Sequence, residues 1–173
     1  MRRKIIFIDV DGPLAWGTWG DGEVKIMEGT SAEFTIPYSW VKEDCDALCE
    51  IIKQTDARLV VSSDWKKHFG ILQLAMIFEH YGIGRWNVMD TTTHFNPRKK
   101  MSSSLEWDRA CEIEMWVKSF KPTNWISIDD IRLNFGYKSL GIPQWHHVQV
   151  DGDWGNGGRL RNKVDECIKK LNK

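Results

Sequence analysis

The chain has 173 residues, 42% of them hydrophobic and 28% charged, which is enough for one globular domain with a substantial core. Lysine and arginine number 24, as do aspartate and glutamate, and this zero net charge argues against a broadly basic protein that wraps nucleic acid, although not against a local basic groove. No apolar run approaches the length of a transmembrane helix, and the stretch that ends at Asp9 is too short for a signal peptide, so we expect a cytoplasmic protein without a membrane segment and with four reduced cysteines.

The first predicted strand spans residues 4–9, where an unbroken run of Ile and Phe ends at a Gly-Pro turn, a pattern typical of a buried strand. Residues 12–38 are rich in Gly, Thr and polar side chains, and short alternating pieces within them predict a hairpin flap over about 13–38. A helix is expected over about 39–54, with Ser39 as its N-cap.

Strands and helices alternate through the rest of the chain. The expected strands are 57–62, a short 87–89, 125–128 and a short 147–150, and the expected helices are 65–81, 105–120 and 160–171. This alternation predicts a single α/β domain over residues 1–173, a three-layer, doubly wound, mostly parallel sheet with helices on both faces and a small flap inserted after the first strand.

Acidic and hydroxyl side chains follow three of the predicted strands. Asp9 and Asp11 follow the first, Ser62 the second, and Asp129 and Asp130 the strand over 125–128. Each is open to a simpler interpretation as a turn or capping residue. Because the carboxyl ends of parallel strands meet at one edge of a sheet, a single active site there accounts for all of them.

Paired carboxylates in such a place suit two kinds of chemistry. They hold a divalent metal ion, or one attacks an electrophile while the other moves a proton. Asp129 and Asp130 would repel each other if both were charged and unpaired, so we expect a cation near them.

Residues 6–12, 60–63 and 126–130 resemble the first, second and fourth motifs of the haloacid dehalogenase (HAD) superfamily, in the family's order. Two shorter patterns, Ser63-x-Trp65-Lys66 and Arg109-x-x-Glu112, resemble the small HAD phosphatases found beside RNA-repair enzymes and the phosphatase halves of polynucleotide kinase-phosphatases. The resemblance implies a HAD-like Rossmannoid fold.

The resemblance also implies a mechanism. Asp9 attacks phosphorus to form an aspartyl-phosphate, and Asp11 protonates the leaving oxygen and then activates water. Mg²⁺ is held by Asp9, the backbone carbonyl of Asp11 and an acid of the Asp129/Asp130 pair. Ser62 is our choice for the hydroxyl that binds the phosphate, and Ser63 is the alternative.

The family also uses a cation to brace the phosphate, usually a Lys near the start of the helix before the fourth motif. Arg109 stands there in this chain, and its planar guanidinium suits phosphate oxygens. Its simpler interpretation is a surface charge or a helix partner of Glu106 or Glu112. Four lysines are the fallbacks for this role: Lys99, Lys100, Lys118 and Lys121.

A small flap leaves an open site, which suits a large substrate such as a nucleic-acid end. Residues 66–68 and 98–100 are basic clusters that suit a phosphodiester backbone, and Trp16 or Trp19 in the flap suits stacking on a base. The sequence therefore predicts a Mg²⁺-dependent phosphatase that acts on a phosphomonoester, either a phosphorylated small molecule such as a nucleotide or a nucleic-acid end.

Three alternatives stay open. The first is a protein that binds phosphate or a nucleotide without turnover, because Pro13 stands where the family commonly has Thr or Val and the usual Lys is missing. A phosphatase of sugar phosphates is the second alternative. The third is a signalling domain like a response-regulator receiver, which the spacing of Asp9 and Asp11 fits less well.

Overall fold

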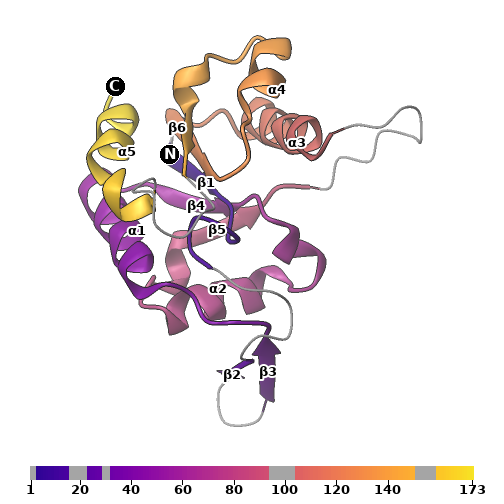
Figure 1. Ribbon diagram of the computed structural model, residues 1–173, viewed down its shortest axis with the longest axis vertical. Helices are drawn as coiled ribbons and strands as arrows, with labels where there is room; N and C mark the ends of the chain where they lie inside the picture. The colour runs from indigo at the N-terminus through magenta and orange to yellow at the C-terminus, as the bar shows by residue number, and fades with distance from the viewer. Residues whose placement is uncertain (1–2, 16–22, 29–31, 94–103, 151–158) are drawn as a thin grey trace.

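The apolar run near the N-terminus forms the central strand of a five-stranded sheet. In this computed structural model, which describes residues 3–15, 23–28, 32–93, 104–150 and 159–173, β1 (Lys4–Ile8) lies between β4 (Arg58–Val61) and β6 (Asn124–Asp129) (Figure 1). The edge strands are β5 (Val88–Thr91) and β7 (His147–Gln149), and every strand pair in this sheet is parallel. The predicted parallel sheet is confirmed.

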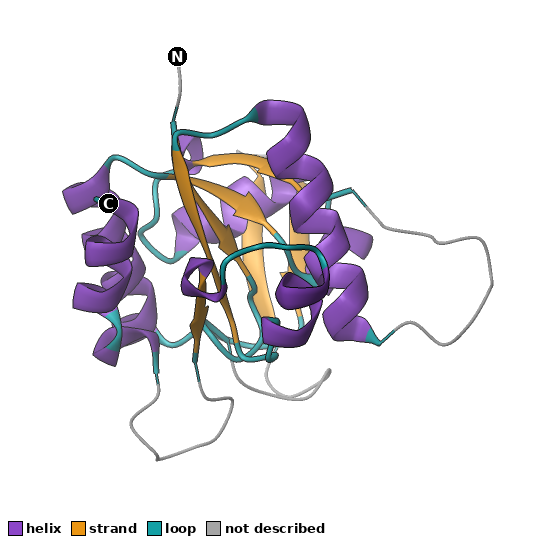
Figure 2. Cartoon of the chain, turned by 90° about the horizontal axis from the view of Figure 1, so that it is seen from above, coloured by secondary structure: helices purple, strands orange, loops and turns teal. Residues whose placement is uncertain are grey.

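Helices cover both faces of the sheet, because successive side chains of a strand point to opposite faces. On one face, the strand side chains pack in a single core with α1 (Lys42–Thr55), α2 (Ile71–His80) and α5 (Val164–Leu171). On the other face they pack against α3 (Leu105–Phe120) and α4 (Asn134–Ser139). Figure 2 shows the sheet between these two helical layers, which confirms the three-layer α/β fold.

The segment after β1 contains an antiparallel hairpin of β2 (Val24–Glu28) and β3 (Ala32–Ile36), as the alternating pattern predicted. Ile26 and Ile36 are buried in the same core as α2, and the rings of Phe34 and Phe69 lie 5.9 Å apart. The hairpin is therefore anchored through its apolar face. Trp16 and Trp19, which we expected to stack on a base, lie outside the described residues.

The helices differ from the predicted ones at several points. The helix expected over 65–81 is two elements, the 3₁₀ helix η1 (Asp64–Lys67) and α2, because Gly70 interrupts it. The helix α1 begins three residues after Ser39, and its N-cap is Val41. The terminal helix begins with a separate turn, η4 (Leu160–Asn162). Short elements without a readable period were not predicted, namely α4, η2 (Arg85–Asn87) and η3 (Gln144–His146).

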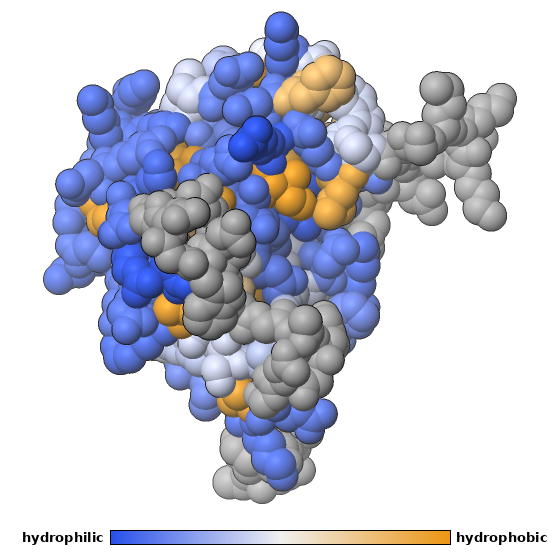
Figure 3. Space-filling view, in the orientation of Figure 1, coloured by the Kyte–Doolittle hydropathy of each residue, from blue (hydrophilic) through white to orange (hydrophobic). Residues whose placement is uncertain are grey.

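On the face drawn in Figure 3, hydrophilic side chains prevail and apolar ones form small separate patches. Among the described residues, no helix combines the length and the apolar character that crossing a membrane requires.

Candidate active site

Backbone hydrogen bonds continue the sheet beyond the ends of its strands and bring the three predicted motifs together. The amide of Asp9 donates to the carbonyl oxygen of Ile128 over 3.0 Å, and the amide of Ser62 donates to that of Ile8 over 2.9 Å. The carboxyl ends of β1, β4 and β6 consequently present Asp9, Ser62 and Asp129 side by side at one edge of the sheet.

Three carboxylates gather at this edge. Oxygen atoms of Asp9, Asp129 and Asp130 all lie within 4.8 Å of one another, and Asp9 and Asp129 are buried. Burial raises the pKa of both Asp129 and Asp130, and the charge of Asp9 raises them further. Because the ionised cluster repels itself, it favours a bound cation. Its oxygen donors are the kind that hard divalent cations such as Mg²⁺ prefer.

Arg109 lies within this acidic cluster. It stands near the start of α3, a helix capped by the hydroxyl of Ser104, which accepts from the amide of Trp107. One guanidinium nitrogen, Nη1, contacts both Asp9 and Asp129, the latter over 2.9 Å. Burial opposes the charge of Arg109, but the two carboxylates raise its pKa overall.

Neither simpler interpretation of Arg109 describes its surroundings. Its side chain is 5% exposed, so it is no surface charge. The glutamates considered as helix partners have other contacts: Glu112 pairs with Lys66, and Glu106 accepts from the amide of Phe135.

Asp11 stands apart from the three clustered carboxylates. Its Oδ1 accepts hydrogen bonds from the hydroxyl of Tyr38 and, over 2.9 Å, from the indole Nε1 of Trp65. Burial raises the pKa of Asp11, and these two hydrogen bonds partly offset the effect. A carboxyl group with a raised pKa is suited to proton transfer near neutral pH. Tyr38 carried no sequence signal of this role, and Trp65 stood out only through the family resemblance.

Gly12 allows the loop after β1 to approach the loop after β6. Its φ is +87°, and a Cβ atom added to it would lie 2.6 Å from Cγ of Asp130. Only glycine fits both conditions. Pro13 is buried in the following turn, where the amides of Leu14 and Ala15 both donate to the carbonyl oxygen of Val10.

The two candidate serines have different surroundings. Oγ of Ser62 is buried and has no hydrogen-bond partner among the described residues. Oγ of Ser63 accepts from the amide of Trp65 over 3.4 Å and caps η1. An unpaired buried hydroxyl beside the acidic cluster is available to a ligand, since buried polar groups normally have partners.

Lys66 is buried rather than part of a surface basic cluster. Its ammonium group contacts Glu112 over 2.5 Å and the hydroxyl of Thr92 over 2.9 Å, and that hydroxyl also donates to Glu112. These contacts join the residues after β4 and β5 to α3, close to Arg109. The long sequence separation of the three residues left no pattern from which to predict the group.

The other basic residues considered from the sequence lie elsewhere. Lys118 is 70% exposed and pairs with Glu114. Lys121 follows the last residue of α3, near the amino-terminal ends of the strands and away from the acidic cluster. Residues 98–100, which include the fallbacks Lys99 and Lys100, lie outside the described part of the chain.

Comparison with known proteins gave one family match. Residues 5–155 match the model of the HAD domain in Swiss Army Knife RNA repair proteins. No curated protein and no solved structure matched the chain. The match spans most of the chain and includes all three strand-end motifs. The chain therefore belongs to the family of HAD domains found in Swiss Army Knife RNA repair proteins.

Proposed function

We propose that this protein is a Mg²⁺-dependent phosphatase that hydrolyses a phosphomonoester, on a nucleotide or a nucleic-acid end, through an aspartyl-phosphate. One observation carries the proposal: carboxylates from distant parts of the chain, Asp9, Asp129 and Asp130, converge within 4.8 Å beside a buried arginine. Membership of the HAD family supports a phosphatase activity of the broad hydrolase type.

The carboxylates of Asp9, Asp129 and Asp130 and the backbone carbonyl of Asp11 would hold the metal ion. Bound Mg²⁺, which HAD enzymes generally use, would neutralise the negative charge that otherwise keeps an anionic phosphate from a carboxylate. The acidic, oxygen-only donor set fits this ion.

The reaction takes place in two steps. A carboxylate oxygen of Asp9 attacks phosphorus, the bond from phosphorus to the ester oxygen breaks, and Asp11 donates its proton to that leaving oxygen. Asp11, now a carboxylate, then takes a proton from a water molecule whose oxygen attacks the phosphorus. This second attack breaks the bond between phosphorus and Asp9 and releases inorganic phosphate. The hydrogen bonds from Tyr38 and Trp65 hold Asp11 in place for both transfers.

Arg109 and Ser62 bind the phosphate oxygens in this proposal. The guanidinium group of Arg109 has five N–H donors, so it can keep Asp129 while it also donates to phosphate. Oγ of Ser62 supplies a further hydrogen bond that no described protein group takes up.

The substrate class rests on two observations. The hairpin β2–β3 has two strands of five residues each, and a small insertion of this kind suits a large substrate. The family, in turn, is that of HAD domains in RNA repair proteins. We further place the protein in the cytoplasm, where its four cysteines, all free thiols in the structure, would stay reduced.

The proposal is tested with a phosphatase panel in the presence of Mg²⁺. The panel holds nucleoside monophosphates, RNA and DNA with 3′- or 5′-phosphates, and sugar phosphates. We expect release of phosphate from nucleotides or nucleic-acid ends, loss of it with EDTA, and loss of at least a thousandfold in Asp9→Asn. Asp46→Asn, which changes an exposed acid on α1, is the matched control and should keep full activity. Turnover of sugar phosphates alone would refute the nucleic-acid part.

A second candidate function is binding of phosphate without turnover. It is favoured by the contact of Arg109 with Asp9, which engages the proposed nucleophile. Calorimetry with phosphate or a nucleotide, combined with no hydrolysis of any substrate on the panel, would select this function.

A further inference from the structure

A cavity opens at the amino-terminal ends of the strands, on the side of the sheet opposite to the acidic cluster. It has a volume of about 380 Å³, within the range of small-molecule sites. It lies between the amino-terminal end of β1, the edge strand β5 and the last turn of α3, and its lining residues are Arg3, Ile5, Met89, Trp116, Phe120, Lys121 and Pro122. Neither the proposed catalytic steps nor the metal site uses any of them.

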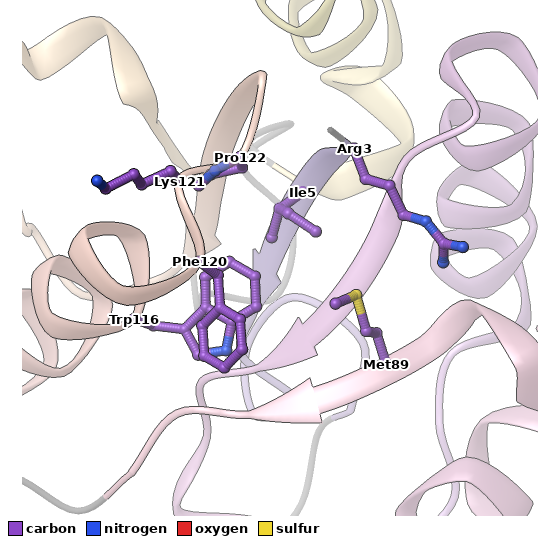
Figure 4. A pocket seen from close by; sticks show the side chains of 7 residues that line it. All are labelled: Arg3, Ile5, Met89, Trp116, Phe120, Lys121 and Pro122. Carbon is purple, nitrogen blue, oxygen red and sulfur yellow. The ribbon is translucent and has the colours of Figure 1, made fainter. Parts of the chain in front are cut away.

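The walls of this cavity are apolar and aromatic. The rings of Trp116 and Phe120 stack with centroids 4.4 Å apart, and Phe120 is 57% exposed. Met89, on the edge strand, is 42% exposed. Figure 4 shows the overlapping rings of Trp116 and Phe120 on one side of the cavity and Met89 on the other, with Ile5 between the rings and Arg3. Because Phe120 is more than half exposed, its ring is accessible to a planar ligand that stacks on it.

Two cationic residues lie on opposite sides of the cavity, Arg3 before β1 and Lys121 after α3 (Figure 4). Among the described residues that line it there is no Asp or Glu, and the nearby Asp90 accepts a hydrogen bond from the indole of Trp116 over 2.7 Å. The site therefore selects for a ligand that joins a planar aromatic ring to a negative charge, because stacking and charge neutralisation are both offered. A nucleobase with its phosphate has this chemistry.

The cavity and the candidate active site lie at opposite ends of α3. Arg109 and Phe120 are separated by roughly 16 Å along the helix axis. This distance corresponds to about five stacked nucleotides at 3.4 Å each.

We propose that the cavity is a nucleotide-binding site that stacks a nucleobase on Phe120 and offers its phosphate a cationic residue on either side, Arg3 or Lys121. The chemistry is the same for a free nucleotide and for one nucleotide within a single strand. The strand interpretation rests on the proposed function, since a strand whose end is processed at Arg109 would then be held here as well.

The test measures binding by calorimetry with two probes that carry no phosphomonoester, cyclic AMP and a single-stranded RNA octamer with hydroxyl ends. It uses the full chain with Asp9→Asn in EDTA, so the result does not depend on turnover or metal. We expect Phe120→Ala to weaken binding by about fivefold to a hundredfold. The double variant Arg3→Gln/Lys121→Gln should weaken it by at least tenfold, with a smaller dependence on salt.

Two matched controls should leave binding unchanged. Leu72→Ala removes an exposed apolar side chain on α2, and Lys53→Gln removes an exposed charge in the last turn of α1. Circular dichroism and urea unfolding establish that every variant is folded. If the octamer binds at least tenfold more tightly than cyclic AMP, the ligand is a strand; if cyclic AMP binds as well or better, it is a free nucleotide.

Three results would overturn the proposal. The first is the absence of binding of both probes at millimolar concentration, and the second is binding that Phe120→Ala leaves intact. The third is a concentration-dependent dimer that Phe120→Ala abolishes while no nucleotide binds, which would make the cavity a contact between copies of the chain. None of these results affects the phosphatase assay, so failure of this site and failure of the proposed function remain distinguishable.

Discussion

Ser62 and Ser63 are neighbours with different expected roles. Ser62→Ala removes an unpaired hydroxyl, so we expect little change in the free energy of unfolding but a fall in kcat/KM of about tenfold to a hundredfold, the value of one hydrogen bond to a charged group. Ser63→Ala removes the cap of η1 and should lower the free energy of unfolding by about 1 kcal/mol. Urea unfolding and phosphatase kinetics on both variants check these outcomes, and an equal effect of the two on kcat/KM would contradict the assignment of Ser62.

Position 12 requires glycine for two reasons, its positive φ and its close approach to Asp130, and Gly82 shares only the first of them. Gly12 and Gly82 have φ of +87° and +85°, but an added Cβ meets Asp130 only at Gly12 and meets nothing within 4 Å at Gly82. Gly82→Ala should therefore cost about 1 kcal/mol of the free energy of unfolding, from backbone strain alone. Gly12→Ala should cost at least about 1 kcal/mol more and should weaken the response of activity to Mg²⁺, because Asp130 is displaced.

Urea unfolding and Mg²⁺ titration of activity measure the two glycine variants. If Gly12→Ala and Gly82→Ala lose equal stability and respond equally to Mg²⁺, close approach to Asp130 is not what requires glycine at position 12.

The sequence allowed us to predict which acids share one edge of the sheet, but not the contacts that hold them. Asp9 and Asp129 follow apolar runs that are readable as buried strands, and parallel pairing brings such ends together. The hydrogen bond from Tyr38 to Asp11 depends on how the chain returns after the hairpin, and no local pattern encodes it. The roles of these residues remain predictions until they are measured.

At the scale of elements, the buried pair of Lys66 and Glu112 joins η1 to α3. Their side chains are only 5% and 8% exposed, so Glu112→Ala leaves a buried ammonium group without its main partner and should lower the free energy of unfolding by about 3 kcal/mol. The double variant Lys66→Met/Glu112→Leu should regain most of that loss, because both charges are gone.

An exposed pair supplies the control for this double-mutant cycle. Lys42 and Asp46 on α1 have side chains 82% and 59% exposed, and Asp46→Ala should cost less than about 0.5 kcal/mol. Urea unfolding measures all variants. A double variant as unstable as Glu112→Ala would mean that packing, rather than the buried charge, accounts for the loss.

Elements with a clear period were predicted well and short ones were not. The strands β1, β4 and β6 are mainly apolar and almost entirely buried, and α3 repeats its apolar residues at helical spacing. The six residues of α4 are too few to display a period, and its place is set by close packing of Gly136 against Ala110 of α3. A local sequence pattern does not reveal a contact between residues so far apart in the chain.

At the scale of the whole molecule, His147 gives the fold a dependence on pH. Burial, with a further contribution from Lys170, lowers the pKa of His147 from 6.5 to about 4. Between these pH values the unfolded chain binds a proton that the folded protein does not. The contribution of His147 to the free energy of unfolding is therefore fully present above about pH 6.5 and is lost as the pH falls toward 4. From pH 7.5 to pH 4.5 this one group should remove about 2 kcal/mol from the free energy of unfolding.

The variant His147→Gln isolates that contribution. Between pH 7.5 and pH 4.5, urea unfolding should show that the wild type loses about 2 kcal/mol more free energy of unfolding than His147→Gln does. All other titrating groups are present in both proteins, so their contributions cancel in this comparison. A difference that stays constant with pH would show that His147 titrates normally in the folded protein.

The position of β1 in the middle of the sheet has a consequence for biosynthesis. Its two neighbours, β4 and β6, come from residues 58–61 and 124–129, so one side of β1 has no partner until most of the chain has left the ribosome. Pairing across so many residues is slow, because a long loop must close first. The three clustered carboxylates therefore come together late, and a nascent chain that ends before Asp129 has no complete acidic cluster.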